Sequence, residues 1–434
     1  MKPLRIVSLL LASLLLRIEV FAEPANKQSP TDAIAQNYVE LVLAMGERDP
    51  GYVDAYYGPE KWKTEAIAKK ETLDQIGHEA SDLRARLSAL PEPSDEMDRL
   101  RLEYLTKQLS ALQSRVEILG GKHLSFDEES KALYDAVAPT FSDEYFAKQL
   151  NAVAAILKVP NDDHLTEHYA VWHNAFIVPK DKVGRVFELA IKECRTRTGQ
   201  HLTLPPEESF TVEYVTNKPW GGYNWYKGNY RSVIQVNMDL PIYIDRAIDL
   251  AAHEGYPGHH VYNSLLEKNL VRDRGWVEFS VYPLYSPQSL VAEGTANYGR
   301  ELVMTPAERT KFEKEVLWPA AGLDPLRVEE YYKVQEIVKK IAYAPNEAAR
   351  GLLDGRIDEG QAKSWLERYA LDEPVRAEHG VEFIKHYRSY VINYNLGEDM
   401  VQRYVERHAG APGKRWEIFG ELLKSPRLPD ALTQ

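Results

Sequence analysis

Residues 251–260 of this 434-residue chain read Ala251-Ala252-His253-Glu254-Gly255-Tyr256-Pro257-Gly258-His259-His260. Three histidines and a glutamate within eight residues are a high concentration for a chain with 12 histidines. In the motif His-Glu-x-x-His, two histidines four residues apart on one helical face bind zinc, and the glutamate acts as general base. Here Pro257 stands four residues after His253, so the literal motif is absent. The second histidine of a metal site would be His259 or His260.

The Pro257-Gly258 pair makes such a site geometrically feasible. Seven residues of straight helix rise ~10.5 Å, whereas two imidazoles on one zinc each need a Zn–N distance of ~2.0–2.1 Å. Proline breaks or kinks a helix, and glycine permits backbone conformations closed to other residues. We expect the chain to fold back at this break and to bring His259 or His260 towards His253.

A hydrolytic zinc site has three protein ligands and one open position. The segment 289–301, Ser-Leu-Val-Ala-Glu-Gly-Thr-Ala-Asn-Tyr-Gly-Arg-Glu, offers the third ligand on a later helix. Glu293 lies among small residues, which allow another helix to approach closely. Glu301, two turns on, is an alternative ligand or a partner of one.

The surrounding sequence predicts a mainly α fold. Apolar residues recur at helical spacing from about Ser29 to Leu157, over Val183–Thr198, and again from Ser289 to about Leu423. The predicted helices include 31–45, 64–90, 94–119 and 126–157. We expect one helical domain over 23–434 with a catalytic cleft, and a metal-site core at about 205–302.

Between the helical regions, the pattern changes to short strands. Residues 210–215 and 230–237 predict a small antiparallel sheet beside the metal helix. The aromatic turn Trp220–Tyr226 between them is a candidate wall of the cleft, or a turn packed under the sheet. The edge of strand Ser232–Asn237 is a candidate site for pairing with an extended peptide. Asp239, with Pro241 in the first turn, predicts the start of the metal helix.

Composition narrows the classes of partner. The chain has 27% charged residues and a net charge of −12, which argues against nucleic acid or an anionic membrane surface as the partner. Cys194 is the single cysteine, so an intramolecular disulfide is impossible, and its sequence context favours a structural role.

The N-terminus is typical of an export signal. Lys2 and Arg5 precede the apolar run Ile6–Leu16, and Val20-Phe21-Ala22 resembles a cleavage site. The run is shorter than the ~20 apolar residues that span a bilayer. We expect a signal peptide at 1–22 and a periplasmic or secreted mature chain. A cysteine for lipid attachment does not follow the run, so no stable membrane anchor is expected after cleavage.

The motif at 253–260 resembles the bacterial domain-of-unknown-function 885 family, whose members carry a His-Glu-x-x-Pro-Gly-His-His-like stretch. The family's second motif, roughly Glu-Gly-Trp-Ala-x-Tyr, is similar to residues 293–298, with Thr295 in place of Trp. Its Tyr-x-x-Gly segment is similar to 394–397, although the family's preceding Pro-Gly-Gln is absent here. The resemblance is clearest from about Trp220 to Glu301.

This resemblance implies an exported, gluzincin-like zinc peptidase. It implies His253, His259 and Glu293 as zinc ligands and Glu254 as general base acting on a metal-activated water. An oxyanion formed during hydrolysis needs a further donor, for which Tyr298, Tyr394, Tyr390 and Arg388 are the candidates. The expected substrate is a peptide or oligopeptide.

Two other functions use the same residues. A zinc hydrolase of a non-peptide amide or ester needs the same metal site. A catalytically inactive peptidase-like fold that binds peptides or a partner protein predicts neither bound zinc nor a functional role for Glu254. A helical scaffold of the cell envelope leaves the histidine cluster unexplained.

Overall fold

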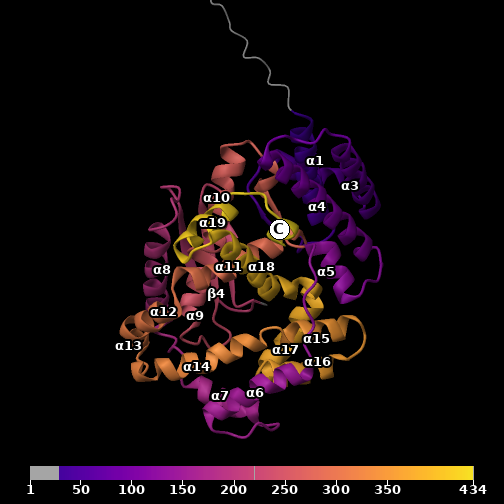
Figure 1. Cartoon of the computed structure of the whole chain (residues 1–434). Helices are drawn as coiled ribbons and strands as arrows, with labels where there is room; N and C mark the ends of the chain where they lie inside the picture. The colour runs from indigo at the N-terminus through magenta and orange to yellow at the C-terminus, as the bar shows by residue number, and fades with distance from the viewer. Residues whose placement is uncertain (1–28, 219, 434) are drawn as a thin grey trace, which may run out of the picture.

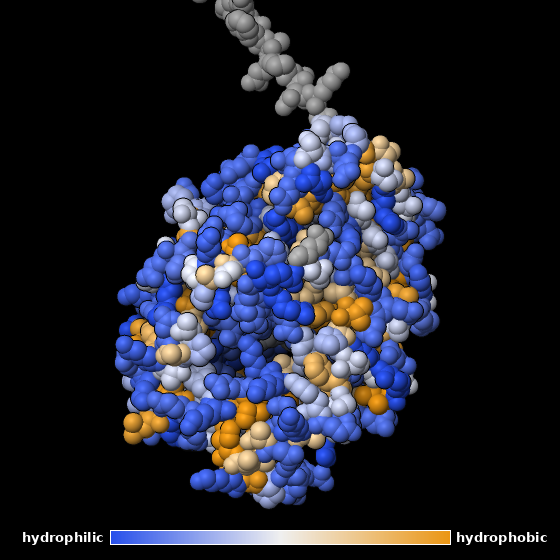
Figure 2. All heavy atoms as spheres, viewed as in Figure 1, coloured by the Kyte–Doolittle hydropathy of each residue, from blue (hydrophilic) through white to orange (hydrophobic). Residues whose placement is uncertain are grey.

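The computed structural model describes residues 29–218 and 220–433. Of the described residues, 67% are helical and 7% are in strands, which confirms the mainly α fold class. The predicted signal peptide at 1–22 lies outside the described residues. Within them, none of the helices combines the length and apolar character needed to cross a bilayer. The face seen in Figure 2 is mostly hydrophilic and is hollowed near its middle.

The N-terminal helices form one flank of the molecule, drawn in indigo in Figure 1. They are α1 (Pro30–Gly46), α2 (Glu60–Lys69), α3 (Leu73–Ser88) and α4 (Glu96–Leu119). The single helix predicted over 64–90 is two helices, which is a correction. Lys70 has a φ of 52° and ends α2, and Thr72 begins α3 with a capping box.

Four more helices continue the helical body: α5 (Phe126–Tyr134), α6 (Asp143–Leu157), α7 (Leu165–Asn174) and α8 (Val183–Gly199). The helix predicted over 126–157 is interrupted between α5 and α6. Asp135 has a φ of 55° there, and Pro139 follows in the connecting loop. Ser142 then caps α6 by accepting a hydrogen bond from the N–H of Tyr145.

Two small sheets lie within this helical body. In one, β1 (Val53–Tyr56) pairs antiparallel with β5 (Val281–Pro283). In the other, β2 (Ser209–Val215), β3 (Gly222–Tyr226) and β4 (Arg231–Asn237) lie in the order β2-β4-β3. β3 and β4 are antiparallel, as expected for a small antiparallel sheet, but β2 runs parallel to β4.

This strand order corrects the prediction about the sheet edge. β4 is the central strand and pairs on both sides, so its backbone is not available to a peptide. The segment expected to be an aromatic turn contains β3, which is an edge strand. β3 comes between β2 and β4 in the sequence and runs opposite to both, so β2 and β4 run in the same direction.

The metal-motif segment follows β4. It comprises α9 (Arg246–Leu250), the π-helical turn η1 (Ala251–Gly255), α10 (His259–Leu266) and the π-helical segment η2 (Glu267–Arg272). The helix starts at Arg246 and not at Asp239, which is a further correction. The Asp239 carboxylate instead accepts hydrogen bonds from the backbone N–H groups of Asn217 and Lys218, so it fixes the loop before β3.

The rest of the chain is helical, and the short 3₁₀ and π segments are labelled η. Its elements are η3 (Val277–Ser280), α11 (Pro287–Val303), α12 (Pro306–Phe312), η4 (Glu313–Leu317), α13 (Trp318–Ala321), η5 (Pro325–Arg327), α14 (Val328–Val338), η6 (Lys339–Ile341), α15 (Ala344–Leu353), α16 (Glu359–Tyr369), α17 (Pro374–Tyr387), η7 (Arg388–Val391), α18 (Ile392–Ala409), η8 (Pro412–Lys414), α19 (Arg415–Leu423) and α20 (Pro429–Thr433).

α11 packs closely on α18 (Figure 1), and this contact positions the side chains that the two helices contribute to the candidate site. A Cβ added to Gly294 would lie 2.4 Å from the carbonyl oxygen of Gly397, and one added to Gly397 would lie 2.6 Å from the carbonyl oxygen of Leu290. Only glycine permits this backbone approach. The small residues around Glu293 therefore do what the sequence predicted and let a second helix reach this helix closely.

Candidate metal centre

The break at Pro257-Gly258 folds the chain back onto the preceding turn. The N–H of Gly258 donates to the carbonyl of Ala252 over 2.8 Å. A Cβ on Gly258 would lie 1.8 Å from the carbonyl oxygen of His253, so no other residue fits there. α10 starts at the next residue, which places the His259 side chain opposite His253.

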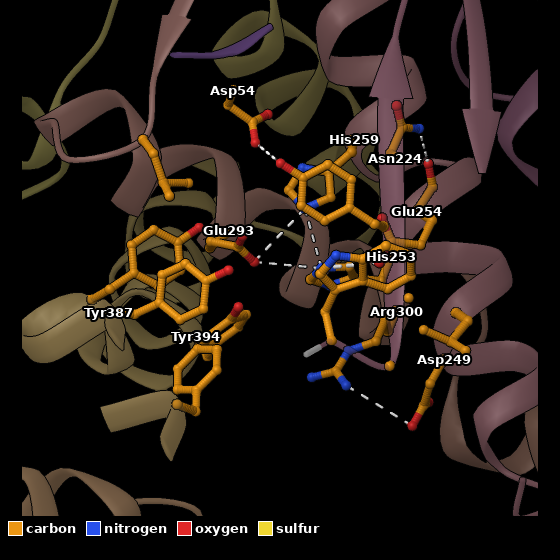
Figure 3. A pocket seen from close by; sticks show the side chains of 18 of the residues that line it. Asp54, Asn224, Asp249, His253, Glu254, His259, Glu293, Arg300, Tyr387 and Tyr394 are labelled. Atoms are coloured by element: carbon orange, nitrogen blue, oxygen red, sulfur yellow. Dashed lines mark hydrogen bonds and ion pairs between the residues drawn. The ribbon is translucent and has the colours of Figure 1, made fainter. Parts of the chain in front are cut away.

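Three of the predicted ligand side chains converge at this point (Figure 3). His253 Nε2 and His259 Nε2 are 3.1 Å apart. Glu293 Oε2 lies 3.4 Å from His253 Nε2 and 3.7 Å from His259 Nε2. The two imidazole rings meet edge to face at 88°, so their nitrogens point to a common centre rather than stacking.

These separations fit a tetrahedral metal. Bonds of about 2.0–2.1 Å at tetrahedral angles place ligand atoms about 3.3–3.4 Å apart, close to the three distances found. Glu293 is 6% exposed, yet its Oε2 atom is buried without a hydrogen-bond partner among the described residues. A buried carboxylate oxygen without a hydrogen-bond donor is costly, and a cation at this centre would satisfy it.

Neighbouring groups hold the ligands in position. His253 Nδ1 lies 2.8 Å from Asn297 Oδ1, which directs Nε2 towards the centre. The hydroxyl of Tyr390 donates to Glu293 Oε1 over 2.8 Å. Asn297 is itself held because its Nδ2 donates to the carbonyl of Tyr394 over 2.7 Å.

The electrostatics of the cluster are those of a site for a cation. Burial would raise the pKa of Glu293, but His259 and His253 outweigh it and hold that pKa well below its usual range. Burial would lower the pKa of His259, but Glu293, Glu254 and Asp54 raise it to about 9. A proton and a metal ion therefore compete for the imidazole of His259.

Glu254 lies beside the cluster but outside the ligand set. Its Oε1 atom is 4.0 Å from His253 Nε2, and the residue is 4% exposed. A Cβ on Gly222 would lie 3.1 Å from Glu254 Oε1, so this glycine allows β3 to pack against the carboxylate. The side chain of Asn224 donates to the carbonyl of Glu254 over 2.7 Å and joins β3 to the metal helix.

A cavity of about 320 Å³ opens onto these groups. It is lined by the cluster, by the segment 220–224, by Asp54 from β1 and by tyrosines from the C-terminal helices, among which Tyr387, Tyr390 and Tyr394 belong to α17, η7 and α18. Of the aromatic segment 220–226, residues 220–224 line the cavity, whereas Trp225 and Tyr226 pack away from it against Gln235 and Glu267. Figure 3 shows Tyr387 and Tyr394 across the cavity from His253.

The structure separates the two neighbouring histidines. His260 is fully buried, with Nε2 2.9 Å from Glu208 Oε2 and Nδ1 2.9 Å from Ser232 Oγ. It therefore points away from the cluster and ties α10 to the sheet. Glu301 is also elsewhere, because its carboxylate pairs with Lys339 at 2.9 Å. Neither alternative ligand is in place.

Two of the four candidate oxyanion donors are also elsewhere, which corrects the prediction. Tyr298 packs its ring on Phe419 and does not line the cavity, because five residues after Glu293 is about 140° around a helix of 3.6 residues per turn. Arg388 pairs with Glu129 at 2.7 Å. Tyr390 and Tyr394 do line the cavity.

Several site residues were not identified from the sequence. Asn297 stands four residues after Glu293, and helical spacing alone indicates that it shares that face. Asp54 comes from β1, about 200 residues away from the motif, and no sequence spacing indicates it. Its carboxylate accepts a short hydrogen bond from the Tyr223 hydroxyl. Burial, opposed by His259 and reinforced by Glu293 and Glu254, raises the pKa of Asp54 to about 7.

Comparison with solved structures places the fold but not the chemistry. The crystal structure of a "putative lipoprotein" from Colwellia psychrerythraea is similar over 93% of this chain and 68% of its own, at 14% identity and a TM-score of 0.51. This likeness shows the fold alone.

Two further solved structures are less similar, with TM-scores below 0.5. A "putative lipoprotein of unknown function" from Shewanella oneidensis matches over 93% of this chain and 87% of its own, at 13% identity and a TM-score of 0.46. Metallocarboxypeptidase 1 of Trypanosoma cruzi matches over 91% and 90%, at 11% identity and a TM-score of 0.31. No family model matches the chain, and no curated protein matches it either.

Proposed function

We propose that this chain is an exported zinc-dependent hydrolase that cleaves peptide bonds. The observation that carries the proposal is the convergence of His253 Nε2, His259 Nε2 and Glu293 Oε2 at mutual distances of 3.1–3.7 Å. The Oε2 atom of Glu293 is buried without a hydrogen-bond partner among the described residues. A cation bound at this point would remove the free-energy cost of that unpaired atom. The resemblance to the domain-of-unknown-function 885 family remains a prediction that points the same way.

The donor set favours zinc. Two imidazole nitrogens and one carboxylate oxygen are the ligands of catalytic zinc sites, which keep a further position open. When bound, zinc supplies Lewis-acid chemistry and lowers the pKa of water from ~15.7 towards ~7. Asn297 and Tyr390 fix the orientation of His253 and Glu293, as the hydrogen-bond partners of metal ligands do.

The remaining chemistry belongs to the side chains around the cluster. Glu254 is placed to accept a proton from water at Oε1 and to deliver it to the nitrogen of the leaving amine. Tyr394 supplies a hydroxyl on the opposite wall. Tyr394 is 36% exposed overall, but desolvation of its hydroxyl in the cavity wall, with Glu293 and Glu254, raises its pKa well above its usual value. The hydroxyl therefore keeps its proton and can donate to a developing oxyanion.

A peptide substrate is favoured by the edge strand in the wall of the cavity. In the β3–β4 ladder, Asn237 donates to the carbonyl of Gly221 and Lys227 donates to that of Arg231. The alternation of antiparallel pairing then directs the backbone N–H and C=O groups of Gly222 and Asn224 away from β4. Asn224 is buried, whereas Gly222 is partly exposed, so Gly222 is the point at which an extended peptide would pair with β3 by strand addition.

Export is supported by the N-terminal pattern of basic, apolar and small residues at 1–22. The Colwellia neighbour, described as a "putative lipoprotein", agrees with an exported chain. The location that we propose for the mature protein is the periplasm or the extracellular medium.

The proposal is tested by elemental analysis of the purified mature chain together with a hydrolysis assay on a peptide mixture. The wild type should carry about one zinc per chain, and His253→Ala should carry almost none. His123→Ala is the matched control, because His123 is exposed and distant in sequence from the cluster. Glu254→Gln should keep the zinc and lose peptide cleavage. A wild-type protein that neither contains zinc nor takes it up would refute the proposal.

A further inference from the structure

One cation in the cavity wall has no role in the cluster described above. Arg246 lines the cavity and is partly exposed. It stands seven residues before His253, and α9 continues directly into η1. Two helical turns place the two residues on the same face, about 10 Å apart along the axis.

A second arginine marks the same end of the cavity. Arg300 stands seven residues after Glu293 on α11 and also lines the cavity. Its Nη1 atom is 3.9 Å from Asp249 Oδ2, one helical turn from Arg246. In Figure 3, Asp249 and Arg300 lie on the opposite side of His253 from Asp54. The cavity therefore has acidic groups beside the metal cluster, and two arginines together with Asp249 at its other end.

These arginines differ in whether they are already paired. Arg300 donates to Glu398 over 3.1 Å and to the carbonyl of Asn297 over 3.2 Å. Asp249 is engaged mainly by Arg309 at 2.9 Å. In contrast, the Arg246 guanidinium makes no hydrogen bond and no ion pair within 4.0 Å among residues 29–218 and 220–433, and it acts on Asp245 and Asp249 only through charge attraction over longer distances. Among the described residues, Arg246 is therefore a cation at this end of the cavity that has no direct hydrogen-bond or ion-pair partner.

The position of Arg246 suits recognition of a bound chain. It lines both this cavity and a second one of about 390 Å³, and Trp220 and Gly221 also line both. A Cβ on Gly221 would lie 3.8 Å from an Arg246 nitrogen, so the strand that leads into β3 passes directly beside the guanidinium. A peptide paired with the free edge of β3 would run past this group.

We infer that Arg246 binds a carboxylate of the substrate and thereby selects peptides with an anionic group near the bond that is cleaved. This inference rests on the proposed peptidase function. The planar guanidinium pairs with carboxylates through two parallel hydrogen bonds. An extended chain covers ~3.3–3.6 Å per residue, so a spacing of about 10 Å places the carboxylate about two or three residues from the bond. The group is the C-terminal carboxylate or an acidic side chain.

The test measures binding and does not require turnover. Zinc-loaded Glu254→Gln is titrated calorimetrically with N-acetyl-tetraalanine as the free acid, with its C-terminal amide, and with an amide whose last residue is aspartate. Charge-assisted hydrogen bonds contribute ~1.5–3 kcal/mol, so we expect the preferred carboxylate peptide to bind about 10- to 100-fold more tightly than the plain amide. Tighter binding of the free acid identifies the C-terminal carboxylate, and equal binding of the aspartyl amide identifies a side chain.

In zinc-loaded Glu254→Gln, the second substitution Arg246→Gln should remove the preference for the carboxylate peptide and leave binding of the plain amide unchanged. Arg231→Gln removes the same charge from an exposed position on β4 and should change nothing. Arg246→Lys keeps the charge but loses the paired geometry, so an intermediate preference is expected, which also guards against a folding defect in the glutamine variant. In the active protein, Arg246→Gln should raise KM for the preferred peptide with little change in kcat.

The outcomes separate the two proposals. Equal binding of all three peptides, or a preference that survives Arg246→Gln, would overturn the role of Arg246 even if the wild type cleaves peptides. A preference that depends on Arg246 in a protein that cleaves no peptide would support the binding site and refute the hydrolase. If wild-type protein cleaves, mass spectrometry should find a released C-terminal fragment of about two or three residues.

Discussion

Replacing His259 and His260 separately by alanine tests whether the structure has assigned the two neighbouring histidines to different tasks. His259→Ala removes one of three nitrogen or oxygen atoms that face the proposed metal. His260→Ala removes hydrogen bonds to Glu208 and Ser232, both of 2.9 Å, from a fully buried position. We therefore expect loss of metal in the first variant and loss of stability in the second.

The size of the second effect follows from the contacts. Two lost hydrogen bonds, one of them to a carboxylate, and the space left by the imidazole together cost about 3–5 kcal/mol. An unfolding entropy of ~2.1 cal/mol/K per residue over about 400 residues is ~0.8 kcal/mol/K, so the Tm should fall by about 4–6 °C.

The assay combines zinc analysis with thermal unfolding on the same preparations. His260→Ala should retain about one zinc per folded chain with a lowered Tm. His259→Ala should retain almost no zinc after dialysis against a weak chelator. The reasoning fails if His260→Ala loses zinc as completely as His259→Ala, or if its Tm matches that of the wild type.

Three further predictions follow from the geometry. Tyr390→Phe removes the hydrogen bond to a metal ligand, so zinc affinity measured by chelator competition should fall ~10- to 100-fold. Gly294→Ala forces a Cβ to 2.4 Å from a carbonyl of α18, and the free energy of unfolding should fall by at least about 1–3 kcal/mol in a denaturant titration. Burial lowers the pKa of His173 to about 3, below its value of ~6.5 in the unfolded chain. The contribution of His173 to the free energy of unfolding is therefore constant above pH ~6.5. Below that pH, the free energy of unfolding falls by up to ~1.4 kcal/mol per pH unit.

Matched variants control these predictions. Tyr298→Phe should leave zinc affinity unchanged, since Tyr298 packs on Phe419 away from the cavity; a fall equal to that of Tyr390→Phe would contradict the site. Gly199→Ala meets nothing within 4 Å and should be nearly neutral, and equal losses would argue against a tight α11–α18 contact. The difference in the free energy of unfolding between the wild type and His173→Gln should be smaller at pH 5 than at pH 7. An equal difference at the two pH values would contradict the pKa shift.

The chain's local chemistry was readable from the sequence. Helical periodicity and capping residues predicted most of the helices, because both depend on contacts within a few residues. Pro257-Gly258 predicted the backbone reversal, since proline breaks a helix and only glycine fits the close approach that follows. Small residues on either side of Glu293 predicted a close helix contact for the same steric reason.

What the tertiary structure decided is which side chains share one space. His259 and His260 are adjacent and chemically identical, and only the packing of α10 between the sheet and α11 turns one to the cluster and the other to Glu208. Asp54 reaches the cavity through β1, whose partner β5 lies far along the chain. The order β2-β4-β3 depends on pairing between strands, which local residue patterns do not encode. Local sequence patterns thus predict the candidate ligand residues and the points where helices break. The assembled site also requires contacts between distant segments, which no residue spacing in the sequence predicts.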